Sequence, residues 1–114
     1  MAHSINELDF QQRAAEAAAA LERAFGAVAD ERDIDVDVEG GVLTITFEEG
    51  TPGKFIVSPN SPARQIWVSA RLASFKFDWS QEHNTFVLHS TGESLFAVMT
   101  RLTREQIGDP TLTL

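Results

Sequence analysis

The sequence predicts an α+β fold, a two-layer α/β sandwich in which two helices cover one face of an antiparallel sheet of five or six strands. Apolar residues recur at helical spacing near both ends of the chain, and apolar and polar residues alternate between them. The turns between the alternating runs are short. This favours antiparallel pairing, because a parallel crossover needs about a dozen residues or more. A chain of 114 residues fits a single domain, here residues 1–114.

The first helix is expected from about residue 5 to residue 28, because apolar side chains form a narrow stripe there. The stripe comprises Phe10, Ala14, Ala17, Ala18, Leu21, Phe25 and Val28. Ser4 or Asn6 is the candidate N-cap. Because the alanine side chains are small, the helix is expected to lie close to the layer that it covers.

Six alternating runs follow and predict strands. The runs are residues 34–38, 42–48, 54–58, 64–70, 74–79 and 85–89. Residues 39–41, "EGG", supply a tight turn, and Pro59 and Pro62 bracket a loop. A second helix is expected from about Gly92 to Gln106, with Thr91 as its cap.

Negative charge is concentrated in the first half of the chain. The net charge is −8, and residues 1–49 carry 12 acidic and 3 basic side chains, whereas residues 50–114 carry 5 and 6. This asymmetry argues against nucleic acid or a membrane as partner and favours cations or a basic protein surface. The chain has no cysteine, which excludes disulfides and a metal cluster held by its own thiolates.

Acidic residues occupy every second position around the first predicted strand, namely Asp33, Asp35, Asp37 and Glu39. Residues two apart on a strand point the same way, about 6.6 Å apart. The acids are therefore expected on an open face, and the β-branched residues between them are expected in the core. One interpretation is that the charges only discourage pairing between sheet edges. The other is a surface that binds hard cations weakly, since neighbours this far apart do not converge on one ion.

No catalytic site assembles in the sequence, and an enzyme is not expected. His3, His83 and His89 lack metal-site spacing and are interpreted as ordinary surface or packing residues. An EF-hand loop is excluded, because Thr44 or Thr46 stands where that loop needs its final glutamate.

Trp67 is a candidate interface residue. Ile66 and Val68 alternate into the core, so Trp67 is expected on the open side of the sheet, with Lys76 nearby on the next strand. An exposed tryptophan among polar groups is a common interface anchor. The alternative is that a neighbouring segment simply covers it.

Four segments resemble the frataxin family, most closely its bacterial, CyaY-type branch. They are "DIDVDVEGGVLTITFEEG", "NSPARQIWVSA", "FKFDW" and the helix after "TGESLF", and they occur in the family's order over nearly the whole chain. The resemblance implies the sandwich fold predicted above. It also implies a role in iron–sulfur cluster assembly, as an iron donor or as a regulator of the cysteine desulfurase, with that enzyme and the iron–sulfur scaffold protein as partners.

The resemblance further implies weak surface binding of iron (Fe²⁺ and Fe³⁺) and a partner site on the sheet. The implied metal residues are Glu16, Glu22, Asp30, Glu31, Asp33, Asp35 and Asp37. The implied partner residues are Ser58, Gln65, Trp67 and Lys76. The chain is expected to be a monomer that could oligomerise with iron. It is expected in the bacterial cytoplasm, or in the mitochondrial matrix if it is eukaryotic and has lost a presequence.

Two alternative functions remain open. The acids could serve only a basic surface of the desulfurase, which would make the chain a metal-independent docking regulator. A ferroxidase is the least favoured alternative, because the sequence shows no close cluster of ligands. The chain also departs from the family pattern in its alanine-rich first helix and in "SARLASF", which replaces a glycine-rich turn.

Overall fold

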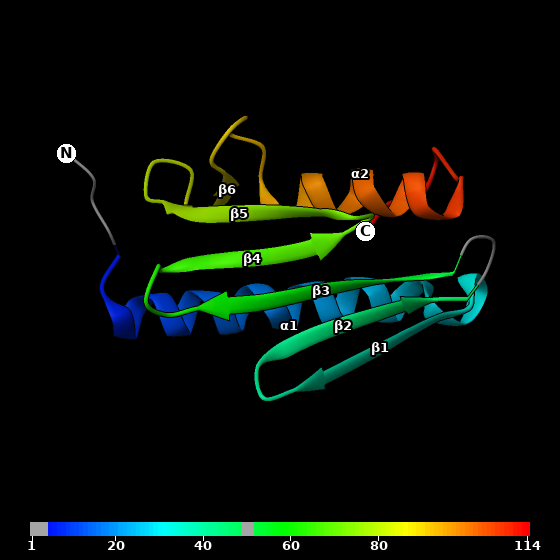
Figure 1. Cartoon of the computed structure of the whole chain (residues 1–114), viewed down its shortest axis with the longest axis horizontal. Helices are drawn as coiled ribbons and strands as arrows, with labels where there is room; N and C mark the ends of the chain where they lie inside the picture. Colours follow the sequence, from blue (N-terminus) through cyan, green and yellow to red (C-terminus); the bar gives the residue numbers. More distant parts are fainter. Residues whose placement is uncertain (1–4, 49–51) are drawn as a thin grey trace.

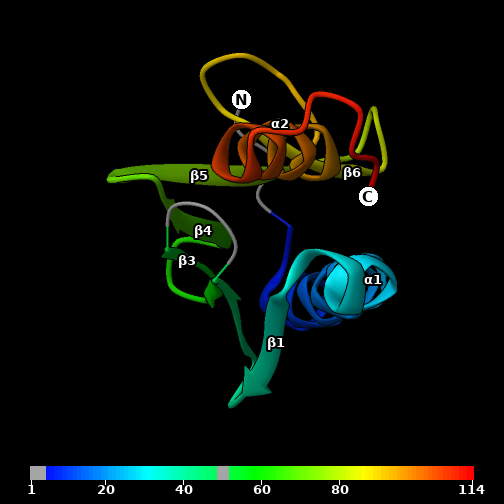
Figure 2. The same cartoon turned by 90° about the vertical axis from the view of Figure 1, so that its right-hand side faces the viewer.

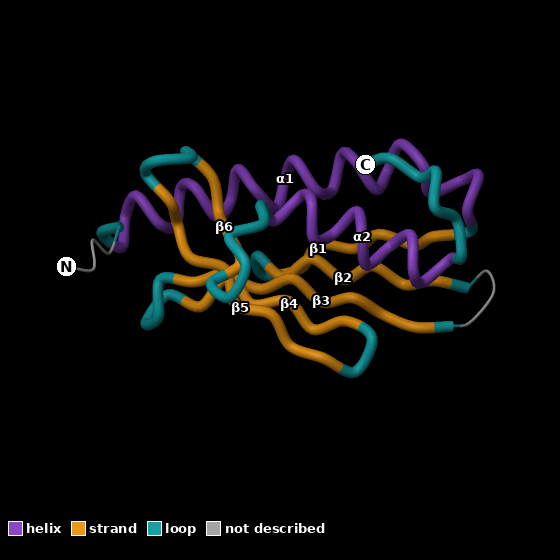
Figure 3. The backbone as a smooth tube through the Cα atoms, turned by 90° about the horizontal axis from the view of Figure 1, so that it is seen from above, coloured by secondary structure: helices purple, strands orange, loops and turns teal. Residues whose placement is uncertain are grey.

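A computed structural model describes residues 5–48 and 52–114 of the chain (Figure 1). The elements are α1 (Glu7–Arg32), β1 (Ile34–Glu39), β2 (Val42–Phe47), β3 (Gly53–Asn60), β4 (Gln65–Ala70), β5 (Ala73–Ser80), β6 (Thr85–Leu88) and α2 (Leu95–Ile107). The six strands form one antiparallel sheet in the order β1-β2-β3-β4-β5-β6. Both helices lie on the same side of this sheet (Figure 3), which confirms the predicted α+β sandwich.

Aromatic side chains dominate the core between the two layers. Six phenylalanines are almost completely buried, namely Phe10, Phe25, Phe47, Phe55, Phe77 and Phe86. Phe10 of α1 meets Phe86 of β6 edge-to-face, with 6.0 Å between the ring centroids. α1 packs along β1, β2 and β3, and α2 packs on β6 (Figure 2). Neither helix, as far as the structure describes it, is long and apolar enough to cross a membrane.

α1 begins two residues after the predicted start and ends one turn after the predicted end. The Asn6 side chain accepts a hydrogen bond from the backbone N–H of Asp9 (2.8 Å), which confirms Asn6 as the N-cap. The alternative cap, Ser4, lies outside the described residues. The helix continues to Arg32 because Val28 and Ala29 still pack against the core.

The predicted start of the second helix is wrong by three residues. α2 begins at Leu95, and the Ser94 side chain caps it by accepting a hydrogen bond from the Ala97 N–H (3.1 Å). Thr91 instead accepts a hydrogen bond from the Glu93 N–H, in a turn that also contains Gly92 at a φ of 79°. This turn keeps the chain out of the helix until Ser94.

β3 continues through Pro59, which was expected in a loop. A proline removes a donor from the strand ladder, so it is tolerated where no ladder bond is needed. The pairing of β2 with β3 ends at Leu43 and Val57, and Pro59 lies beyond that point. No β2–β3 ladder bond is therefore lost at Pro59.

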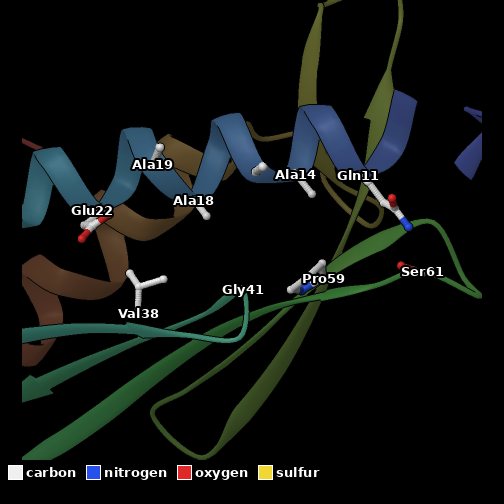
Figure 4. A pocket seen from close by; sticks show the side chains of 10 residues that line it. Gln11, Ala14, Ala18, Ala19, Glu22, Val38, Gly41, Pro59 and Ser61 are labelled. Carbon is white, nitrogen blue, oxygen red and sulfur yellow. The ribbon is translucent and has the colours of Figure 1, made fainter. Parts of the chain in front are cut away.

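A groove of about 350 Å³ separates α1 from the β1–β2 turn (Figure 4). Its walls include Ala18 and Ala19 of α1 and, opposite them, Val38, Gly41 and Pro59. The expectation that the alanines bring α1 close to the sheet is wrong here, because their side chains are too short to close the gap. Val38 was expected in the core and is instead 43% exposed.

Filling this groove should stabilise the fold. Ala18→Leu adds three carbon atoms that would contact Val38 and Pro59, so we expect the free energy of unfolding in urea to rise by about 1 kcal/mol. Ala27→Leu makes the same change of helix propensity on an exposed position of α1 and serves as the control. An equal effect of the two substitutions would show that the groove walls are not the cause.

The C-terminal segment is bonded to the ends of both helices. Arg32 at the end of α1 forms an ion pair with Asp109, and the Nε atom of Arg104 donates to the Leu112 carbonyl (2.6 Å). Hydrogen bonds from the Thr111 hydroxyl and backbone N–H, together with the charges of Arg32 and Arg104, lower the pKa of Asp109. The ionised form of Asp109 is thus favoured by the fold.

This lowered pKa predicts a loss of stability at acidic pH. Asp109 binds its proton less tightly in the folded chain than in the unfolded chain. Its contribution to stability is therefore complete above the unfolded pKa of about 3.9 and is lost as the pH falls through the folded pKa. Asp109→Asn should lower the thermal midpoint at neutral pH. On acidification, the thermal midpoint of this variant should fall less than that of the wild-type protein. Glu82→Gln, which removes an exposed carboxylate, should leave the pH profile of the midpoint unchanged.

Candidate functional site

Three carboxylates line the open face of β1, at the edge of the sheet. Asp35, Asp37 and Glu39 are exposed, and the Ile34 and Val36 side chains between them are buried and half-buried. β1 pairs only with β2, so these side chains stand on an edge strand. We call these three residues the acidic edge.

The acidic edge is not neutralised by any side chain in the part of the chain that the structure describes. Within residues 5–48 and 52–114, no side chain forms an ion pair or a hydrogen bond with the carboxylates of Asp35, Asp37 or Glu39. The nearest arginine in sequence, Arg32, forms an ion pair with Asp109. Cations and basic side chains from solution therefore have access to these carboxylates.

Asp33 does not belong to the strand row in which the sequence places it. It is the C-cap of α1, with left-handed backbone (φ 55°), and its N–H donates to the Ala29 carbonyl. β1 begins one residue later, at Ile34. Asp33 is exposed, so it adds charge at the α1–β1 junction and not on the open face of β1.

The acids of α1 fall on two sides of the helix. Glu22 lines the groove opposite Val38 and so faces the strand that carries the acidic edge (Figure 4). Glu16 is bonded to Arg13 (3.4 Å) and lies beside Trp79 and Phe96, on the flank that faces β5 and α2. The structure therefore brings Glu22, and not Glu16, toward β1.

Asp30 and Glu31 are exposed in the last turn of α1, which ends at Arg32. In the described part of the chain, no group of three or more histidine, cysteine, aspartate or glutamate side chains converges in a way that could hold a metal ion. A hard cation at this surface would have few protein ligands and would complete its shell with water.

The predicted partner residues lie together on the open face. Ser58, Trp67 and Lys76 stand opposite one another on β3, β4 and β5, so they form a row across the sheet. Gln65 is two residues before Trp67 on the same face. We call Ser58, Gln65, Trp67 and Lys76 the tryptophan face.

A chain of hydrogen bonds fixes the Trp67 ring. The Trp67 Nε1–H donates to the Gln65 side-chain oxygen (2.9 Å), and the Gln65 amide donates to Asp78 (3.0 Å). The other carboxylate oxygen of Asp78 lies 3.1 Å from the His89 Nδ1 atom. The Lys76 Nζ atom sits 5.0 Å from the centroid of the Trp67 ring, where the ring quadrupole attracts a cation.

The sequence did not identify Asp78 as part of this site. Asp78 shares a face of β5 with Lys76, but its bond to Gln65 depends on the register that places the two residues opposite each other. His89 was interpreted as an ordinary residue, and the structure shows it bonded to Asp78 at the surface.

The tryptophan face borders a hollow of about 230 Å³ on the sheet. Trp67 is 38% exposed and Ile56, on the neighbouring strand, is 39% exposed. Ser69 and Ser74 also line the hollow. The open face thus combines a hollow that has apolar walls with a carboxylate-lined edge.

The chain is similar to known proteins in both sequence and fold. The family model of the frataxin-like domain matches residues 3–109 of the sequence, so the chain belongs to the frataxin-like family. Frataxin from Psychromonas ingrahamii has a similar structure, with a TM-score of 0.68 over 90% of this chain and 91% of that one. At 20% identity this likeness shows the fold alone.

Curated relatives carry a more specific name. The iron-sulfur cluster assembly protein CyaY of Azotobacter vinelandii is 38% identical over 84 residues, which cover 72% of this chain and 74% of the relative. The protein of the same name from Pseudomonas fluorescens is 34% identical over 107 residues, or 92% of each chain.

Loss of the Gln65 side-chain amide should leave the Trp67 ring free to move. Gln65→Leu keeps the volume of the side chain but deletes both of its hydrogen bonds, so we expect the indole N–H signal of Trp67 to shift and to exchange faster with solvent. The signal of Trp79, which contacts Phe86 and Arg13, is the internal control in the same NMR spectrum. An unchanged Trp67 signal would mean that Gln65 does not hold the ring.

Proposed function

We propose that this chain is an iron-binding accessory protein of bacterial iron–sulfur cluster assembly, which acts in the cytoplasm and docks on a cysteine desulfurase–scaffold complex. The names of its relatives and its membership of the frataxin-like family support this function. One observation carries it: Asp35 and Asp37 are exposed and unpaired among the described residues, on the same open face as Trp67.

Iron is the cargo in this proposal and not a resident cofactor. Ferric iron is a hard cation and ferrous iron a borderline one; both bind carboxylate oxygens, and each aspartate of the acidic edge offers two. Because the carboxylates do not converge, each ion would exchange rapidly and bind weakly. Weak binding at an exposed surface suits a protein that transfers iron to another protein.

The tryptophan face supplies the protein-binding part of the function. Trp67 is held in place by its hydrogen bond to Gln65, which is itself bonded to Asp78, so little side-chain freedom is lost when a partner covers the ring. The acidic edge lies on the same side of the sheet and would meet basic side chains of the desulfurase.

A metal-independent docking regulator is the second candidate. The observation that favours it is the lack of a converging ligand group in the part of the chain that the structure describes. In this case the carboxylates of the acidic edge would serve only the basic surface of the desulfurase. The same lack of convergence gives no support to a ferroxidase.

An iron titration separates these candidates. In NMR spectra recorded with Fe²⁺ under anaerobic conditions, we expect the amide signals of residues 34–38 to broaden first, at micromolar or higher iron. Asp35→Asn combined with Asp37→Asn should abolish this broadening. Glu16→Gln combined with Glu82→Gln removes the same charge from other exposed positions and should preserve it.

The same variants are then tested for binding to the desulfurase–scaffold complex, with and without iron. Loss of binding by the Asp35/Asp37 variant in the absence of iron, together with no selective broadening in the wild-type protein, would replace the iron-binding proposal with the docking regulator. Broadening centred on a different segment would refute the acidic edge as the iron surface.

A further inference from the structure

The hairpin turn between β4 and β5 has an unusual composition for its backbone. Ala70 and Ala73 form the last pair of the two strands, and Arg71 and Leu72 alone connect them. Both connecting residues have left-handed backbone, with φ values of 49° and 65°. Two-residue turns of this kind strongly prefer Asn-Gly or Asp-Gly, because glycine and asparagine adopt left-handed backbone at little cost.

The Leu72 side chain does not stabilise the fold by burial. Its side chain is fully exposed, with 108% of the reference surface accessible. A leucine in the left-handed region is strained by its own Cβ atom, and burial of the side chain does not offset that strain here. Strained residues that the surrounding structure holds in place are a reason to look for a function.

The turn is held firmly by α2. The Nη1 atom of Arg71 donates to the side-chain oxygen of Gln106 (2.8 Å), and its Nε atom lies 3.8 Å from Glu105. Gln106 is buried, so it is a rigid support. The loop that joins β4 and β5 projects from the sheet on the side away from α1 (Figure 3). Leu72 is therefore presented from a fixed position.

The Arg71–Leu72 turn connects the two strands whose open face carries Trp67 and Lys76. Ser69 and Ser74, the pair that precedes Ala70 and Ala73, line the hollow that Ile56 and Trp67 also line. Ile56 stands opposite Ser69, so the exposed apolar residues Trp67 and Ile56 lie on the open face of the strands that lead to the turn. A partner that covers this part of the open face would lie at the end of the sheet that carries Leu72.

The charges along this surface indicate the chemistry of the partner. Lys54 lies two residues before Ile56 on the same face of β3, and Lys76 lies beside Trp67. Neither lysine forms an ion pair with any residue that the structure describes. A partner that covers this end of the sheet is thus expected to place carboxylates next to its apolar contact.

We propose that Leu72 is a second docking anchor, which inserts into an apolar socket bordered by carboxylates on the protein that binds the tryptophan face. This inference rests on the proposed function, in which that protein belongs to the desulfurase–scaffold complex. The strain of the Arg71–Leu72 turn is then retained because it projects an apolar side chain where the partner can reach it.

The test uses opposite effects on stability and binding. Leu72→Gly relieves the left-handed backbone, so its thermal midpoint should rise by about 4 °C. The same substitution deletes the anchor, so its dissociation constant for the complex should increase about tenfold or more. Leu72→Met keeps a long apolar side chain and should retain most of the affinity. Leu8→Ala removes a different exposed leucine and should leave binding unchanged.

Each result decides a different claim. Equal affinity of Leu72→Gly and the wild-type protein would overturn the Leu72 anchor and leave the proposed function intact. A lower thermal midpoint together with weaker binding would show that Leu72 acts only through the structure of the turn, which also overturns the proposal. No binding of the wild-type protein to the complex would overturn both this inference and the proposed function.

The expected carboxylates on the partner can be tested in the same assay. Lys54→Gln should weaken binding modestly and reduce its dependence on salt, because one attractive charge pair is lost. A salt dependence identical to that of the wild-type protein would contradict a carboxylate border near Lys54.

Discussion

The phenylalanine-rich inner face of the sheet has to be shielded from water, and α1 and α2 do this by packing over it. Because side chains alternate along a strand, burial of Phe55 and Val57 sends Ile56 to the opposite face. The same rule turns Asp35, Asp37 and Trp67 outward. The exposure of both candidate sites is thus a consequence of how the core is built.

The two candidate sites differ in how firmly the protein holds them. Trp67 is bonded through Gln65 to Asp78 and has Lys76 over its ring, so its position is fixed before any partner arrives. The carboxylates of the acidic edge have no such bonds among the described residues. A fixed aromatic ring suits recognition of a shaped surface, and free carboxylates suit exchange of hydrated ions.

Features that depend only on the alternation within a strand could be predicted from the sequence. The open-face position of Asp35, Asp37 and Trp67 follows from the two-residue repeat, and the order of the six strands follows from the short turns between them. Asn6 could be predicted as one of two N-cap candidates, beside Ser4, because capping is a local interaction. The predicted helix and strand ranges differ from the structure mainly at their ends.

Features that depend on distant segments or on single backbone angles could not be predicted. The bond from Gln65 to Asp78 requires the register of two strands. Val38 is exposed because α1 and the β1–β2 turn diverge around short alanine side chains. Asp33 leaves the strand row because its backbone is left-handed, an angle that the alternating pattern does not encode.

The order of the strands also has a consequence for how the chain folds. Each strand pairs with the strand that precedes or follows it in the sequence, so every step of sheet formation closes only a short loop and loses little chain entropy. α1 packs on β1, β2 and β3, which are made directly after it. The N-terminal half therefore has apolar partners of its own, which do not depend on β6 or α2.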